Sequence, residues 1–319
     1  MTSTADRASR TSDIDILISE VGPRDGLQSV DRTMPTAVKH RWIAALADAG
    51  LREIEVASFV SPKRLPQMAD AADVVAQALT IPNLTVLALV PNVIGARNAI
   101  AAGARNLTMP ISASRAHSTS NVGMSPEQAL EQVAAVAELR TVTPELHLEV
   151  GISTAFGCTM EGPVNEDWVI DMAVTAAGNG ADSVGLSDTT GYANPAQIKR
   201  LFTRLRAELG EHAGGAHLHN TRGQGLANVV AALDVGVRTF DSSQAGLGGC
   251  PYAPGASGNI VTEDLVCLLE SMGLRTGIDI DAMIAARAII TEGLPGEDLY
   301  GHVPDAGLPK GFRYAGQRA

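Results

Sequence analysis

Short strand-like segments alternate with longer segments of helical periodicity along most of the chain. The strand-like segments cover residues 15–21, 53–58, 85–90, 106–111, 147–153, 183–187, 216–219 and 238–242. The helical segments cover residues 36–49, 68–78, 95–102, 126–139, 167–179, 195–209, 226–235 and 261–271. Eight such units predict an α/β fold, a closed (β/α)8 TIM barrel, which typically needs about 250 residues. An open doubly wound sheet is the alternative.

A weak internal repeat supports the barrel. Gly50, Gly103, Gly180 and Gly236 each follow a helical segment, and a strand-like segment begins about three residues later. Glycine can adopt a positive φ, which ends a helix and turns the chain into the next strand. The repeat therefore indicates one recurring strand–helix unit.

The 319 residues are expected to form a flexible leader (1–13), a catalytic barrel (14–276) and a helical and irregular extension (277–319) that packs on the barrel. The leader is polar and lacks the apolar stretch of a secretory signal. No apolar run is long enough to cross a bilayer. Three widely spaced cysteines argue against a disulfide framework. We expect a cytoplasmic protein with no membrane partner.

The charge balance limits the partners. The chain has 24 basic and 35 acidic side chains, and the formal net charge is −11. General binding to nucleic acid or to an anionic membrane needs a basic surface, so both are excluded as main functions. Hydrophobic residues make up 45% of the chain and aromatic residues only 3% of it, and there are 32 glycines. This composition indicates an aliphatic core and close-approaching loops.

His217 and His219 lie in the seventh strand-like segment. Side chains in a strand alternate between faces, so both imidazoles point the same way. Two histidines on one face are a good start for a divalent metal site. A hydrogen-bonded pair of core histidines explains the spacing equally well.

Charged residues also follow the first strand and lie within the second. Glu20, Arg24 and Asp25 lie where barrel enzymes place metal ligands, at the carboxyl end of a strand. Glu55 stands in an apolar run and points either to solvent or into the barrel. A local salt bridge is the simpler interpretation of Arg24 and Asp25.

A glycine-rich segment, residues 246–259, follows the last strand and suggests a mobile loop that approaches substrate. It lacks the Gly-Lys-Ser/Thr ending of a nucleotide P-loop, so we reject that function. Cys250 lies within this segment; an inert thiol is the simpler interpretation, and its position on a loop favours reactivity.

Together these motifs resemble the 3-hydroxy-3-methylglutaryl-CoA lyase family of metal-dependent barrel lyases. The resemblance covers roughly residues 15 to 275 and rests on four motifs: Gly22-Pro-Arg-Asp-Gly-Leu-Gln28, Ser58-Phe-Val-Ser-Pro-Lys63, His217-Leu-His219, and Gly246-Leu-Gly-Gly-Cys-Pro-Tyr-Ala253 with Gly255-Ala-Ser-Gly-Asn259. The resemblance implies the (β/α)8 fold and retro-aldol cleavage of a branched 3-hydroxyacyl-CoA.

The resemblance also implies roles for individual residues. Mg²⁺ or Mn²⁺ would bind to Asp25, His217, His219 and Asn259. Arg24 would stabilise the developing enolate, Glu55 and Asp188 would complete the polar site, and Cys250 would enter from the loop. The proton of the substrate hydroxyl would pass to His217, or to Asp25 through water.

Three departures from the family pattern concern the substrate. Gly151 stands near the position where the family usually has a tyrosine or a similar residue, Arg115 replaces a usual glutamate, and Arg222 lies in Asn220-Thr221-Arg222 where Asp-Thr-Tyr/Phe is usual. Arginines near the mouth suit a carboxylate or the phosphates of CoA; ordinary surface charge is the alternative. Substrate binding is assigned to Gln28, Lys63, Arg115 and Arg222, with Lys310 as a further cation.

We therefore predict a lyase that cleaves 3-hydroxy-3-methylglutaryl-CoA to acetyl-CoA and acetoacetate, acting as a homodimer. A related substrate such as citramalyl-CoA, a Claisen-condensing acyltransferase of the same superfamily, and a non-catalytic metabolite-binding protein are the alternatives.

Overall fold

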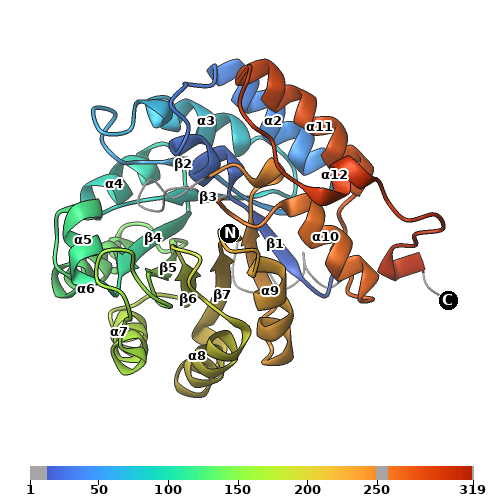
Figure 1. Cartoon of the computed structure of the whole chain (residues 1–319). Coiled ribbons are helices and arrows are strands. Elements are labelled where there is room, and N and C mark those ends of the chain that lie inside the picture. Colours follow the sequence, from blue (N-terminus) through green and yellow to red (C-terminus); the bar gives the residue numbers. More distant parts are fainter. Residues whose placement is uncertain (1–12, 249–257, 318–319) are drawn as a thin grey trace.

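Eight parallel strands close into a barrel in chain order, and the last strand pairs with the first (Figure 1). The computed structural model describes residues 13–248 and 258–317. The predicted (β/α)8 TIM barrel is confirmed, and the open sheet is excluded. The strands are β1 (Leu17–Glu20), β2 (Glu53–Ser58), β3 (Thr85–Leu89), β4 (Asn106–Ser112), β5 (His147–Ser153), β6 (Ser183–Asp188), β7 (Ala213–Leu218) and β8 (Thr239–Ser242).

Helices surround the barrel on its outside (Figure 1). The α-helices are α2 (Thr36–Asp48), α3 (Ala71–Ala78), α4 (Val93–Ala101), α5 (Arg115–Val122), α6 (Pro126–Ala137), α7 (Glu166–Gly178), α8 (Pro195–Leu209), α9 (Gly225–Asp234), α10 (Thr262–Ser271), α11 (Ile280–Gly293) and α12 (His302–Ala306). Shorter helical turns are the π-helix η1 (Gly22–Gly26) and the 3₁₀ turns η2 (Pro66–Met68), η3 (Glu138–Thr141), η4 (Gly210–His212), η5 (Gln244–Gly246) and η6 (Ala315–Gln317).

The repeated glycines precede every second strand. Gly50, Gly103, Gly180 and Gly236 have φ values of 104°, 100°, 99° and 89°. Each lies three residues before the start of β2, β4, β6 or β8. The left-handed conformation that these turns need is one that glycine adopts without steric cost.

Gly50 allows a strong test of this turn. A Cβ at this position would lie 2.2 Å from the carbonyl oxygen of Gly277. Because the contact is with backbone and φ is positive, Gly50→Ala is expected to lower the free energy of unfolding by about 2 kcal/mol or more. Chemical denaturation measures this change. Gly178→Ala is the control, since its added methyl meets no atom within 4 Å; an equal loss in both variants would contradict the expectation.

Strand side chains alternate between two environments. Along β5 the residues are alternately half-buried and fully buried, and β6 repeats this pattern. The fully buried side chains, such as Leu148 and Ile152, pack outward against the helices, and Trp42 of α2 lies fully buried in the same outer core. The other set faces the lumen of the barrel, where the candidate site lies.

The extension after residue 276 packs along the barrel. Helix α11 lies beside α2 (Figure 1). Buried Glu270 of α10 accepts hydrogen bonds from the amides of Thr276 and Ala315, and the Tyr314 hydroxyl accepts one from the amide of Ile280. These contacts hold the last described residues against α10 and α11. Of the described helices, none is both long and apolar enough to cross a membrane.

Candidate active site

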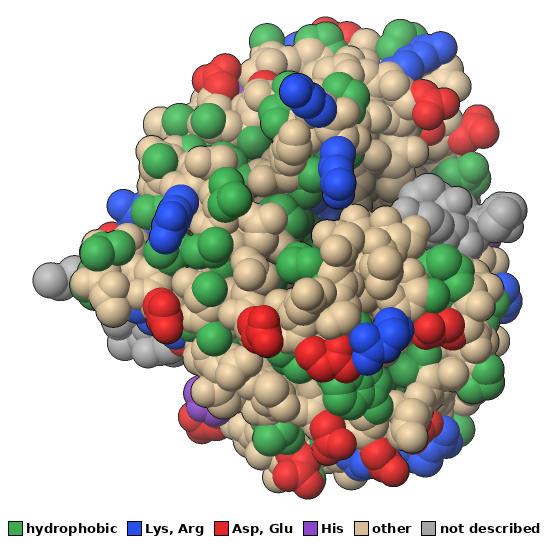
Figure 2. Space-filling model, turned by 90° about the vertical axis from the view of Figure 1, so that its left-hand side faces the viewer, with side chains coloured by type: hydrophobic (Ala, Val, Ile, Leu, Met, Phe, Trp, Pro, Cys, Tyr) green, Lys and Arg blue, Asp and Glu red, His purple; other side chains and the backbone are tan. Residues whose placement is uncertain are grey.

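A cavity of about 740 Å³ occupies the lumen and its mouth at the carboxyl ends of the strands. Its wall includes Arg24, Asp25, Glu55, His217 and His219, which come from β1, β2 and β7 or from the segments directly after them. A space-filling view shows a hollow near the middle of one face, with lysine or arginine side chains beside it (Figure 2). The volume is in the range that holds small-molecule ligands.

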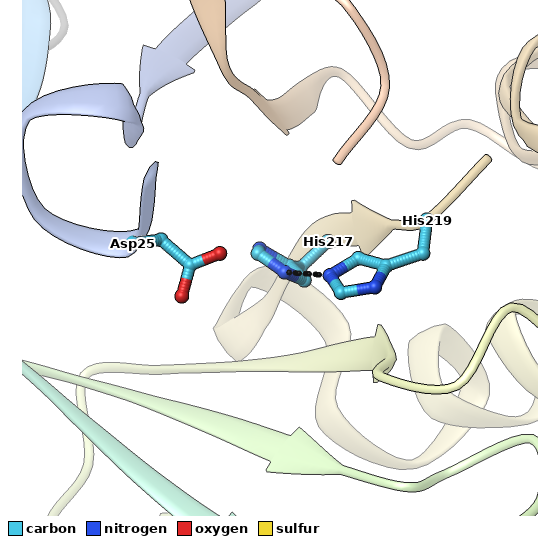
Figure 3. Close-up of side chains that lie close together, drawn as sticks. All are labelled: Asp25, His217 and His219. Carbon is cyan, nitrogen blue, oxygen red and sulfur yellow. Dashed lines mark hydrogen bonds between the residues drawn. The ribbon is translucent and has the colours of Figure 1, made fainter. Parts of the chain in front are cut away.

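The two histidines at the carboxyl end of β7 face each other. Their Nε2 atoms are 3.1 Å apart (Figure 3). Nδ1 of His217 lies 3.0 Å from the carboxylate of Asp241 on β8. His219 lies just past the end of β7 and pairs with Asn259 in an isolated β-bridge. The bridge brings the end of the glycine-rich segment next to the histidines.

Asp25 completes the group from the other side of the lumen. It lies in η1, a π-helical turn directly after β1, and such turns are frequent at functional sites. One carboxylate oxygen of Asp25 and one ring nitrogen from each histidine lie within 4.8 Å of one another (Figure 3). The amide nitrogen of Asn259 donates to Asp25 at 2.6 Å. Three chain segments thus converge on one point.

The surroundings set the charge of this group. Burial alone would raise the pKa of Asp25, but Arg24, the two histidines and Asn259 together lower it to about 2. Burial and the neighbouring His217 lower the pKa of His219 to about 3. Asp25 is therefore a carboxylate and His219 a neutral imidazole at neutral pH, the forms in which these side chains bind metals.

These residues fit a divalent cation. The side-chain oxygen of Asn259 and Nδ1 of His219 are buried and have no hydrogen-bond partner among the described residues. A buried polar atom without a partner is costly and implies a missing ligand or water. A donor set of carboxylate, amide and imidazole suits Mg²⁺ or Mn²⁺ better than it suits a structural Zn²⁺.

Arg24 is held between two carboxylates. Its Nε donates to Glu55 and its Nη1 donates to Asp25 at 2.5 Å. Glu55 is buried, and it accepts a further hydrogen bond from the hydroxyl of Thr108 on β4. The guanidinium is thereby fixed at the cavity wall beside the metal-binding group, with its charge preorganised.

Glu20 has a supporting position and is not part of the cavity wall as described. Its Oε1 accepts hydrogen bonds from the amides of Gly22 and Gln244, each at 2.8 Å, and its Oε2 accepts one from the hydroxyl of Thr262 at 2.6 Å. Burial raises the pKa of Glu20 to about 8. This side chain ties η1 to η5 and α10, and so it joins the segments that carry Asp25 and flank Asn259.

Gln28 lies at the cavity, whereas Asp188 is hydrogen-bonded to the backbone of the loop after β6. Gln28 lines the cavity and donates to Asp25 at 2.8 Å. Asp188 uses one oxygen to accept from the amides of Tyr192 and Ala193, and burial raises its pKa to about 6. Asp188 therefore shapes the loop after β6. Cys250 lies outside the described residues.

The predicted cations at the rim stand apart from the described cavity wall. Arg115 is exposed and forms an ion pair with Glu127 at 2.5 Å. The guanidinium of Arg222 lies 4.5 Å from the ring centroid of Tyr192 and donates to two backbone carbonyls. Lys63 and Lys310 are exposed, and the neighbour of Lys63, Arg64, is the one that lines the cavity.

Sequence reasoning missed Asp241 and Arg64. Asp241 faces the lumen on β8, two residues after Thr239, and holds the ring of His217. The alternation of side chains along the last strand could have identified it. Arg64 follows the Ser58–Lys63 motif directly, but only the folded loop shows that it borders the cavity.

Comparisons with known proteins agree with this geometry. A family model described as HMGL-like matches residues 15–290. The hydroxymethylglutaryl-CoA lyase of Bacillus subtilis (strain 168) is 40% identical over 280 residues, which cover 87% of this chain and 92% of that protein. The mitochondrial hydroxymethylglutaryl-CoA lyase of Mus musculus is 40% identical over 279 residues, covering 88% and 86%. A solved structure of an HMG-CoA lyase from Acinetobacter baumannii, in complex with coenzyme A and 3-methylmalate, superposes with a TM-score of 0.88 at 37% identity and covers 93% of this chain and 97% of that one.

Proposed function

This chain belongs to the HMGL-like family and is a carbon–carbon lyase, and we propose that it cleaves 3-hydroxy-3-methylglutaryl-CoA to acetyl-CoA and acetoacetate. The observation that carries this proposal is the convergence of Asp25, His217 and His219 at the wall of a ligand-sized cavity, beside a buried arginine. Retro-aldol cleavage of a tertiary alcohol needs a polarised hydroxyl and a cation near the thioester. The proposed metal-binding residues would polarise the hydroxyl, and Arg24 is the cation near the thioester.

The residues proposed to hold the metal are Asp25, His217, His219 and Asn259. When bound, Mg²⁺ or Mn²⁺ would supply Lewis-acid polarisation of the substrate oxygens, an effect worth several kcal/mol. Asp241 orients His217 through Nδ1, and such supporting carboxylates fix the ring and increase its basicity. Gln28 and Arg24 hold the carboxylate of Asp25 in place.

The protein then has to move one proton and stabilise one developing charge. The proton of the tertiary hydroxyl passes to His217, or through water to Asp25. Its loss allows the C–C bond to break, and the bonding electrons move into the thioester fragment as an enolate. Arg24, fixed by Glu55, offers its guanidinium to the enolate oxygen. Protonation of the enolate carbon then gives acetyl-CoA. Cys250, which lies outside the described residues, is proposed as the acid for this step, and the proton taken up from the hydroxyl by His217 or Asp25 restores its thiol.

The CoA part of the substrate is anionic, whereas the chain carries a net charge of −11. Binding therefore needs local cations at the mouth. Arg64 is an exposed guanidinium at the cavity wall, and arginine pairs well with phosphate oxygens. We assign Arg64, with Lys63 beside it, to the CoA phosphates.

Release of acetyl-CoA tests the function. With Mg²⁺ or Mn²⁺ present, the full chain is expected to release one acetyl-CoA for each 3-hydroxy-3-methylglutaryl-CoA, and a chelator is expected to stop the release. Citramalyl-CoA serves as the competing substrate, and labelled acetyl-CoA with a 2-oxo acid tests for net condensation. No acetyl-CoA from either substrate would refute the lyase proposal, and faster cleavage of citramalyl-CoA would refute the substrate assignment.

A further inference from the structure

One side of the barrel lumen is hollow. The lumen of a TIM barrel is usually filled by layers of bulky branched side chains. Here three neighbouring strands place glycines in the cavity wall: Gly151 on β5, Gly185 on β6 and Gly215 on β7. Gly151 and Gly185 are partners in the strand register. The cavity therefore extends into the barrel on the β5–β7 side.

Two of these three positions require glycine for steric reasons, and the third does not. A Cβ on Gly185 would lie 2.6 Å from the carbonyl oxygen of Gly215, and a Cβ on Gly215 would lie 2.8 Å from the carbonyl oxygen of Thr239. Close approach of the strands thus requires these two. A Cβ on Gly151 would have Ser187 Oγ, at 3.7 Å, as its nearest neighbour. The fold does not require glycine at 151, so its absent side chain creates space.

The wall of this hollow is polar and carries no free cation among the described residues. Ser153 and Ser187 line it next to Gly151, and neither hydroxyl has a hydrogen bond to another described group. The charged side chains on this part of the wall are the carboxylates of Glu149 and Asp241. The hydroxyls of Ser153 and Ser187 can donate to an oxygen. The two carboxylates, which pair with His147 and His217, leave no free cation on this part of the described wall for a negatively charged group. An alkyl group would displace water without replacing its hydrogen bonds.

The hollow is continuous with the candidate metal site. Gly215 lies two residues before His217 on the same face of β7, and both line one cavity. In the proposed reaction the hydroxyl on C3 of the substrate lies at the metal-binding group. Besides its thioester arm, C3 carries a carboxymethyl group and, in 3-hydroxy-3-methylglutaryl-CoA, a methyl group. The described wall of the hollow offers no free cation to the carboxymethyl group, so the methyl group can point into the hollow.

We propose that the hollow bounded by Gly151, Ser153 and Ser187 is a subsite for an uncharged, oxygen-bearing C3 substituent larger than methyl. The inference rests on the proposed function, because it assumes a 3-hydroxyacyl-CoA in the cavity. It extends the proposed substrates from 3-hydroxy-3-methylglutaryl-CoA to homologues with a group of ether or alcohol type at C3. Gly151 is the residue that determines this specificity.

Binding of three compounds that cannot be cleaved tests the subsite. They are 3-methylglutaryl-CoA, 3-(methoxymethyl)glutaryl-CoA and 3-propylglutaryl-CoA, which lack the C3 hydroxyl needed for retro-aldol cleavage. Calorimetry on the full chain with Mg²⁺ gives each Kd. The methoxymethyl compound is expected to bind about fivefold more tightly than the propyl compound, which has the same number of heavy atoms, as one neutral hydrogen bond would predict. It is also expected to bind more tightly than the methyl compound.

Gly151→Val fills the hollow and is compatible with a strand. This variant is expected to weaken binding of the methoxymethyl compound about tenfold and to leave the methyl compound within about twofold, while Gly178→Ala changes neither. Tightest binding of the methyl compound, equal binding of the propyl and methoxymethyl compounds, or unchanged Kd values in Gly151→Val would each overturn the proposal. Failure of the proposed function is a separate result, since it shows as absence of acetyl-CoA release from the hydroxylated substrate.

Discussion

His217→Ala is expected to lower kcat/KM for acetyl-CoA release by at least about 10³-fold, since loss of metal assistance removes several kcal/mol of transition-state stabilisation. His217 contributes one of the three ligand atoms that lie within 4.8 Å of one another, and it is the ring that Asp241 orients. Removal of the imidazole leaves only Asp25 and His219 of these three ligand groups, with an empty space where the ring of His217 was. The fold is expected to survive, because the side chain faces the cavity and not the outer core. Steady-state kinetics with Mn²⁺ and circular dichroism measure the two effects.

His212→Ala is the matched control. His212 is an exposed histidine in η4; its ring contacts the backbone carbonyl of Asp182, and it is not part of the described cavity wall. Mn²⁺ binding, measured by electron paramagnetic resonance, separates loss of metal from loss of a general base. His217→Ala is expected to weaken Mn²⁺ binding and His212→Ala is not. Turnover like that of the wild type in His217→Ala would refute the assignment of this ligand.

Local sequence signals located most of the barrel. β2, β5 and α8 have the predicted bounds, and Ser125 and Asn194 cap α6 and α8, each directly before a proline. Helix α5 was not predicted. Its sequence is polar and short, and periodicity cannot identify it. Ser114 starts this helix by accepting a hydrogen bond from the amide of His117, and a glycine at 123 in the left-handed region ends it.

The candidate site could be predicted from the sequence less completely than the fold. Period two along a strand indicates that His217 and His219 share a face, but the distance of Asp25 and Asn259 from them depends on closure of the barrel between β1 and β8. Resemblance to the family suggested these residues, and only the structure places them together. The charge of a residue does not tell where its side chain lies. Arg115 and Arg222 are satisfied by Glu127 and by a tyrosine ring, whereas Arg64, which no motif included, borders the cavity.

Arg24→Gln is expected to lower kcat by about 10²–10³-fold, the range found when a group that stabilises a developing oxyanion is removed. Arg24 is fixed by Glu55 and Asp25 and carries the positive charge next to the proposed position of the enolate. Because this charge acts mainly in the transition state, KM is expected to change much less than kcat. Mn²⁺ binding is expected to remain, since Arg24 is not a proposed ligand and Gln28 and Asn259 still donate to the carboxylate of Asp25. Kinetics and Mn²⁺ titration of the same preparation check both statements.

Arg64→Gln is the control for charge at the cavity wall. Arg64 is exposed and assigned to the CoA phosphates, so its loss is expected to raise KM severalfold at nearly constant kcat, because binding of the phosphates is equal in the ground state and the transition state. Arg24→Gln also leaves Glu55 buried without its cation, and burial then favours the protonated acid. If this uncompensated carboxyl were the only cause of the lost activity, the double variant Arg24→Gln, Glu55→Gln would recover kcat. Recovery in the double variant, or a fall in kcat of the same size in Arg64→Gln, would contradict a direct role of the Arg24 guanidinium at the enolate.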